Sequence, residues 1–119
     1  MIITFLTDFG LQDDFVGTCH GVIKRIAPEA EIIDITHGIP PQQVLQGSLV
    51  LSNTLPYMPV GVHLAVVDPG VGSHRRPLAL RTGGGRFFSS PLRSISLERS
   101  AHRAKRSQCV ESHEPQMSR

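Results

Sequence analysis

The chain has 119 residues, a length that fits one domain and is short for two. Its 12 Lys and Arg against 10 Asp and Glu give a net charge of +2, and 39% of its residues are apolar. This balance excludes collagen-like, coiled-coil and wholly disordered chains. No apolar run approaches the roughly 18 residues of a membrane span, and the first residues lack a signal-peptide pattern. With two widely separated cysteines, we expect a cytoplasmic protein with reduced thiols and no membrane association.

Three apolar runs predict strands at residues 2–7, 31–36 and 62–67. The first run is continuously apolar and β-branched, which is typical of a strand that is buried on both faces. Shorter strand patterns follow at residues 78–80 and 86–88. We expect the three longer strands to be adjacent and parallel.

The segments between these strands have helical spacing. The first expected helix starts after Asp13-Asp14, whose oxygens can cap it, and ends at Pro28. The second starts after Pro40-Pro41 and stops at Pro56. The expected apolar faces comprise Phe15, Cys19, Val22, Ile23 and Ile26 in the first helix, and Val44, Leu45, Leu49 and Ser52 in the second.

Alternating strands and helices predict an α/β fold with a mainly parallel sheet and flanking helices. In open sheets of this kind, ligands bind beyond the carboxyl ends of the strands. Asp8 follows the first strand and Asp68 follows the third, so both are expected at that edge.

The composition changes after Phe88. All 11 glycines precede this point, and residues 89–119 carry a net charge of +3 and scattered apolar residues. We interpret residues 1–88 as a partial α/β domain and residues 89–119 as a disordered or out-of-frame tail without stable packing. The alternative is a basic arm for nucleic acid, but three acids and no aromatic residue in the tail disfavour it, so we expect no nucleic-acid partner. The basic residues that suggest such an arm are Arg99, Arg103, Lys105 and Arg106.

Asp8 lies in the tetrapeptide Thr7-Asp8-Phe9-Gly10. A carboxylate at a strand end, followed by a glycine that lets the chain turn, suits hydrogen bonding to a vicinal diol such as a ribose. The alternative is an aspartate that only caps a helix or closes a turn. The sequence contains neither GxGxxG nor GxxxxGK[ST], so a phosphate-binding loop is excluded.

The segment Val67-Asp68-Pro69-Gly70-Val71-Gly72 leads into the pair Arg75-Arg76. A glycine-rich loop can approach a ligand closely, and an aspartate beside an arginine can orient a water molecule while it stays ionised. The alternative is an Asp–Arg pair that merely ties the loop together.

Two histidines of the first 88 residues, His20 and His37, favour ordinary roles. His20 is expected to face solvent from the first helix. His37 follows the second strand and could line the site, but an ordinary loop histidine is favoured. Asp13, Asp14 and His20 lack metal-ligand spacing, so we expect no metal site. No Ser–His–Asp or Cys–His hydrolase arrangement is visible.

Taken together, Thr7-Asp8-Phe9-Gly10, Asp34-Ile35-Thr36-His37, and Val67 to Gly72 with Arg75-Arg76 resemble the S-adenosyl-L-methionine hydrolases. These enzymes are also called S-adenosyl-L-methionine hydroxide adenosyltransferases and are related to fluorinating and chlorinating enzymes. The resemblance covers residues 1 to about 88 and stops at Phe88.

The resemblance implies the N-terminal part of a two-domain protein that forms a homotrimer, with sites between neighbouring subunits. Water attacks C5′ of the substrate S-adenosyl-L-methionine and gives adenosine and L-methionine, without a cofactor. Asp8 matches a ribose-binding aspartate, and Asp68 and Arg75 match two members of a water-activating Asp–Arg–His set, Asp68 also contacting substrate. Neither His102 nor His113 has the context of the third member, so we expect this chain to be a poorly active fragment.

Two alternatives to the hydrolase remain open. One is a halide-using relative, which a carboxylate at Asp68 disfavours because it would repel an incoming halide. The other is a non-catalytic fragment that binds adenosine through Asp8 and cannot turn over.

Overall fold

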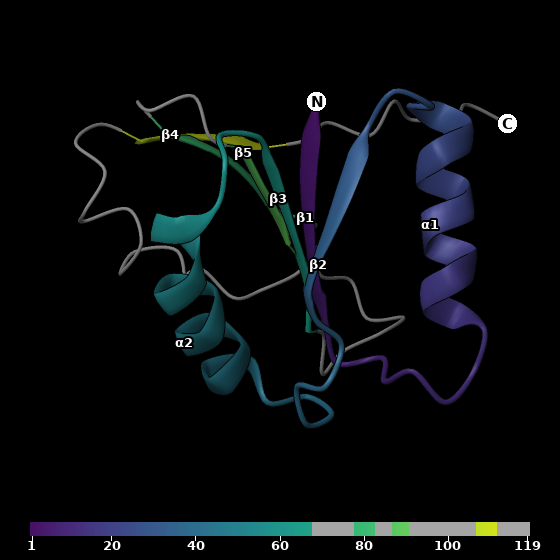
Figure 1. The fold of residues 1–119 in the computed structure, drawn as a ribbon. Coiled ribbons are helices and arrows are strands. Elements are labelled where there is room, and N and C mark those ends of the chain that lie inside the picture. Colours follow the sequence, from purple (N-terminus) through teal and green to yellow (C-terminus); the bar gives the residue numbers. More distant parts are fainter. Residues whose placement is uncertain (68–77, 83–86, 91–106, 112–119) are drawn as a thin grey trace, which may run out of the picture.

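The computed structural model describes residues 1–67, 78–82, 87–90 and 107–111 (Figure 1). In these segments six strands form one sheet in the order β2-β1-β3-β5-β4-β6. The strands are β1 (Ile2–Thr7), β2 (Glu31–Thr36), β3 (Val62–Val66), β4 (Leu78–Thr82), β5 (Phe87–Ser90) and β6 (Ser107–Glu111).

The predicted trio of adjacent parallel strands is confirmed. β1 lies in the middle, with Ile3 paired in parallel to Ile32 of β2 on one side and to Val62 of β3 on the other. β3 ends at Val66, one residue earlier than expected. β3 and β5 are also parallel, whereas β4 is antiparallel to both β5 and β6. The α/β class with a mainly parallel sheet is therefore confirmed.

β1 is buried on both faces, as its continuous apolar run predicts. Phe5 is 1% exposed and its ring lies 6.1 Å from that of His20 in helix α1 (Phe15–Ile26). Leu6 is 0% exposed and packs in one cluster with Leu51 of helix α2 (Val44–Thr54). The two helices accordingly lie on opposite sides of the strands in Figure 1.

Helix α1 has the predicted bounds but not the predicted packing. Its start is held by Asp13, whose Oδ1 accepts a hydrogen bond from the Phe15 N–H at 3.0 Å. Within α1, all of which is described, Val16 is the one buried residue, and Ile26 is 80% exposed. The expected apolar face is therefore only partly right: Cys19 and Ile23 are half-buried, whereas the other three expected residues are exposed. The helix instead turns Val16 and His20, four residues apart on one face, toward the sheet.

Helix α2 is followed by a single 3-10 turn, η1 (Leu55–Tyr57). Its expected face is right at Val44, which packs against the core, but wrong at Leu45, which is 70% exposed. Gly47 and Leu51 are buried instead. A Cβ atom at Gly47 would lie 3.0 Å from Cγ2 of Val67, so the glycine allows the helix to approach the sheet closely. Periodicity alone missed this face because a glycine contributes no apolar signal.

The main core lies between α2 and the sheet. Its buried members come from β1, β3 and α2, and from the segments directly next to α2 and β3. They are Leu6, Ile39, Leu51, Leu55, Ala65 and Val67, with Ile35, Val44 and Val50 packed against them. Among the helices that the structure describes, none is both long enough and apolar enough to cross a membrane.

The structure also contains elements beyond residue 88. β5 extends to Ser90, and β6 pairs with β4, with Cys109 opposite Leu80. The sequence did not predict β6, whose apolar residues do not alternate regularly. Residues 91–106 and 112–119 lie outside the described residues, so the domain boundary at residue 88 and the character of the tail stay predictions.

Candidate functional site

The strand order places a ligand-binding edge beside β1. The chain passes from β1 through α1 to β2 on one side, and then through α2 to β3 on the other side of β1. The strand order therefore reverses between β1 and β3, and open α/β sheets bind ligands at such a point, beyond the carboxyl ends of the strands. Thr7 pairs with Val66 at this edge, and the Asp8 N–H donates a hydrogen bond to the Val66 carbonyl at 3.3 Å.

Asp8 lies at this point, as predicted. The side chain is half-buried, and its Oδ2 accepts a hydrogen bond from the backbone N–H of Gln42 at 2.9 Å. Gln42 has a φ of 66°, a conformation that few residues other than glycine adopt. An ionised carboxylate can accept about four hydrogen bonds, so Asp8 keeps the capacity to accept bonds from a ligand's hydroxyl groups.

The turn that carries Asp8 is fixed on both sides. The Phe9 N–H donates to Oγ1 of Thr7 at 3.2 Å, and the Gly10 N–H donates to the His37 carbonyl at 2.8 Å. Gly10 has a φ of 73°, which glycine adopts without a steric penalty. The turn therefore ties the end of β1 to the residue that follows β2.

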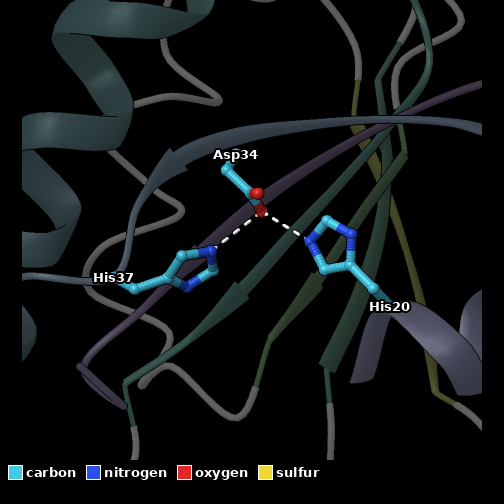
Figure 2. A group of neighbouring side chains, drawn as sticks. All are labelled: His20, Asp34 and His37. Atoms are coloured by element: carbon cyan, nitrogen blue, oxygen red, sulfur yellow. Dashed lines mark hydrogen bonds and ion pairs between the residues drawn. The ribbon is translucent and has the colours of Figure 1, made fainter. Parts of the chain in front are cut away.

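A second group of polar side chains, which we call the His–Asp–His cluster, comprises His20, Asp34 and His37 (Figure 2). Oδ1 of Asp34 lies 2.9 Å from Nε2 of His20 and 2.8 Å from Nε2 of His37. Nδ1 of His37 lies 2.7 Å from Oγ1 of Thr7. The cluster thus joins α1, β2 and the end of β1.

A consistent set of hydrogen bonds runs through this cluster. Phe9 N–H donates to the Thr7 hydroxyl, and this hydroxyl can donate to Nδ1 of His37. A neutral His37 then donates its Nε2–H to Asp34, which also accepts from His20. Burial acts to raise the pKa of Asp34, but the hydrogen bonds from His37 and His20, together with the electrostatic attraction of both rings for the carboxylate, outweigh burial and hold this pKa below its ordinary value of 3.8.

The sequence predicted the positions of the two histidines only in part. His20 was expected to face solvent, but its side chain is 33% exposed and turned toward Asp34. His37 lies outside β2, directly after its end, as predicted, but it is buried, 5% exposed, and bonded on both ring nitrogens. The spacing of Asp34 and His37, three residues apart across a strand end, could have suggested that they interact.

The remaining predicted site residues, Asp68 and Arg75, lie outside the described residues, so their roles stay predictions. Sequence reasoning also missed Thr7 and Gln42. Gln42 acts through its backbone N–H, and a role of the backbone cannot be predicted from the type of residue.

The fold and this edge define an α/β domain with a carboxylate at its switch point, and comparison with known proteins gives the family. Residues 3–113 match the family of the SAM hydroxide adenosyltransferase N-terminal domain, and the chain belongs to that family. The predicted resemblance is thereby confirmed, and the match extends beyond residue 88.

Individual relatives agree with this family assignment. The chain is 57% identical over 83 residues to the (R)-S-adenosyl-L-methionine hydrolase of Salinispora arenicola, an alignment that covers 70% of this chain and 32% of that protein. It is 33% identical over 81 residues to the fluorinase of an Actinoplanes species, covering 67% and 27%. The crystal structure of an uncharacterized conserved protein from Thermotoga maritima superposes with a TM-score of 0.78 at 40% identity, covering 92% of this chain and 42% of that one. The chain therefore spans about a third of the length of the hydrolase that it matches.

Proposed function

We propose that this chain provides the N-terminal part of an enzyme that hydrolyses S-adenosyl-L-methionine to adenosine and L-methionine. The observation that carries the proposal is the Asp8 carboxylate, held by the Gln42 N–H at the switch point of a chain that belongs to this family. The 57% identity to a protein named (R)-S-adenosyl-L-methionine hydrolase supports hydrolysis as the reaction.

Asp8 would bind the ribose of the substrate. A vicinal diol presents two hydroxyl donors at a spacing that one carboxylate can accept together, and the bond from Gln42 occupies part of one oxygen's capacity. The turn bonds at Phe9 and Gly10 hold this carboxylate in place before the ligand arrives, which lowers the entropic cost of binding.

Asp68 and Arg75 would act on water. The new bond forms between the water oxygen and C5′, while the C5′–S bond breaks and its electron pair returns to sulfur, so the sulfonium becomes a neutral thioether. The leaving group therefore needs no proton, and the water proton passes to solvent. What the reaction requires is an oriented water close to C5′, which Asp68 can supply by accepting its hydrogen bond while Arg75 keeps the carboxylate ionised. No metal or redox cofactor takes part in this scheme.

The test uses a full-length counterpart that carries these first 88 residues. A chromatographic assay should show that Asp68→Asn abolishes adenosine release while adenosine still binds, whereas Asp8→Ala mainly weakens binding. Glu29→Gln, the same type of change at an exposed position between α1 and β2, should behave as the parent. Equal turnover by Asp68→Asn and the parent would refute the proposed role of Asp68.

The 119-residue chain on its own should show little or no hydrolysis. It spans about a third of the length of the hydrolase relative, so it offers few of the groups that would cover the substrate and exclude bulk water. Loss of positioning alone can remove on the order of 7 kcal/mol of barrier lowering. Robust turnover by the short chain that disappears in its Asp68→Asn variant would contradict this expectation.

Two alternatives have specific tests. The fluorinase relative makes a halide nucleophile a second candidate, and formation of a 5′-halo-adenosine by the full-length counterpart would establish it. A non-catalytic fragment that binds adenosine would give a calorimetric signal with the 119-residue chain that Asp8→Ala removes, without turnover.

The assembly and compartment are also part of the proposal. We expect the full-length counterpart to form a homotrimer, which light scattering would measure. We expect it in the cytoplasm, where a free thiol such as Cys19 stays reduced.

A further inference from the structure

We infer that His20, Asp34 and His37 form a binding site for a zinc ion that ties helix α1 to strand β2. Each residue offers one ligand atom, and the three atoms lie within 4.8 Å of one another. The inference does not depend on the proposed reaction, in which no metal takes part, and metal binding can be measured without any substrate.

The distances within the cluster are close to those that zinc requires. In tetrahedral coordination with bonds of about 2.0–2.1 Å, ligand atoms lie about 3.3 Å apart. The two nitrogens lie 2.9 and 2.8 Å from Oδ1 of Asp34, so each nitrogen–oxygen pair must separate by about half an ångström. The two nitrogens lie within 4.8 Å of each other and must approach to about 3.3 Å. Figure 2 shows both rings turning a nitrogen toward the same carboxylate oxygen, so rotation of these three side chains would bring their ligand atoms around one ion.

Thr7 supplies the outer support that a metal-binding histidine needs. A histidine that ligates through Nε2 carries its proton on Nδ1 and donates it to a neighbouring acceptor, which fixes the ring. Oγ1 of Thr7 lies 2.7 Å from Nδ1 of His37 and has a second lone pair for the Phe9 N–H. At His37, binding of the ion would therefore need a proton shift from Nε2 to Nδ1 and rotation of the Thr7 hydroxyl.

The surroundings of the cluster also suit a metal. The ring of Phe5, 1% exposed, lies 5.0 Å from that of His37 and 6.1 Å from that of His20, so one side of the cluster is apolar and dry. Asp34 is 40% exposed and His20 33%, so the other side is open to an entering ion and to a water that would complete four ligands.

The choice of zinc follows from the ligand atoms. Two imidazoles and one carboxylate favour zinc and its neighbours, whereas calcium and magnesium take oxygen ligands. Such an ion would have a clear structural effect, because Val16 is the one fully buried residue of α1, whose residues are all described. A link from His20 to Asp34 and His37 would fasten this weakly packed helix to the sheet.

The test titrates the purified, chelator-treated 119-residue chain with Co²⁺, a spectroscopic substitute for zinc. We expect the intense visible bands of four-coordinate cobalt, no thiolate charge-transfer band from Cys19, and displacement of cobalt by zinc. Zinc should also slow hydrogen exchange of the α1 amides. A pale six-coordinate spectrum, or unchanged exchange in α1 with zinc bound, would overturn the inference.

Variants decide which residues bind the ion. His20→Gln, at a partly exposed position, should fold as the parent by circular dichroism and lose the cobalt bands. The matched control is His102→Gln combined with His113→Gln, the same change outside the cluster, which should retain them. Thr7→Val should weaken binding by about 10–100-fold, while Thr7→Ser, which keeps the hydroxyl, should not. Retention of the bands in His20→Gln, or their loss in the control, would show that the cluster is not the site.

Discussion

The turn that carries Asp8 can be tested through Gly10. This residue has a φ of 73°, and among the residues that the structure describes, apart from its two chain neighbours, no atom lies within 4 Å of the position that a Cβ would occupy. Gly10→Ala therefore introduces no clash, and its whole effect is the cost of placing an L-residue in the left-handed region, about 1–2 kcal/mol. Gly10→Asn is the matched variant, because asparagine adopts this conformation more readily than alanine does.

The size of the effect depends on how the chain responds. If the turn keeps its shape, urea unfolding of the 119-residue chain should show Gly10→Ala less stable by about 1–2 kcal/mol, with Gly10→Asn between it and the parent. If the turn relaxes, the bond from Gly10 N–H to the His37 carbonyl at 2.8 Å is lost and Asp8 moves. The cost of about 1–2 kcal/mol then falls on ligand binding, and calorimetry should show an adenosine affinity that is about 5–30-fold weaker.

These outcomes share one rank order: the parent, then Gly10→Asn, then Gly10→Ala. An alanine variant equal to the parent in both the free energy of unfolding and adenosine affinity would refute the argument that a left-handed glycine holds Asp8. A Gly10→Asn variant with lower stability or weaker adenosine binding than Gly10→Ala would refute it too, because side-chain size would then matter more than the backbone angle.

Two further predictions concern the packing of α2. Leu51→Ala should lower the free energy of unfolding by about 2–5 kcal/mol, whereas Leu45→Ala, at a position 70% exposed, should change it by less than about 0.5 kcal/mol; equal effects in denaturant titration would contradict the observed helix face. Gly47→Ala should destabilise the parent, because its Cβ would lie 3.0 Å from Cγ2 of Val67. In a Val67→Ala background this contact is absent, so the higher helix propensity of alanine should make the same change stabilising by up to about 1 kcal/mol. Additive effects in this double-mutant cycle would show that the two side chains do not meet.

Much of the fold could be predicted from the sequence because the strands are short apolar runs separated by helical segments. The three parallel strands and the bounds of α1 follow from this pattern and from Pro28. The faces of the helices do not, since which side packs is decided by contacts with the sheet. Leu45 and Leu49 are the stronger apolar signal in α2, yet Gly47 faces the core because it allows the closest approach.

The site was predictable to a smaller extent. A carboxylate directly after a parallel strand is expected at the carboxyl edge, and Asp8 lies there. The His–Asp–His cluster was not predicted, because His20 and Asp34 are 14 residues apart and meet only once α1 folds back over β2. Helical periodicity counts a histidine as polar and so assigned His20 to the solvent side.

Thr7 explains why the two sites are physically connected. In a strand that is buried on both faces, a threonine fits the β-branched pattern, so the sequence gives no sign that its hydroxyl has a role. Its hydroxyl nevertheless bonds the Phe9 N–H of the turn that carries Asp8 and Nδ1 of His37 in the cluster. Because that hydroxyl has one proton, it can donate to His37 only while Nδ1 is unprotonated, and it becomes an acceptor from both partners once Nε2 ligates an ion. The hydrogen bonding of Thr7, directly before Asp8, therefore depends on the protonation and ligation of the His–Asp–His cluster.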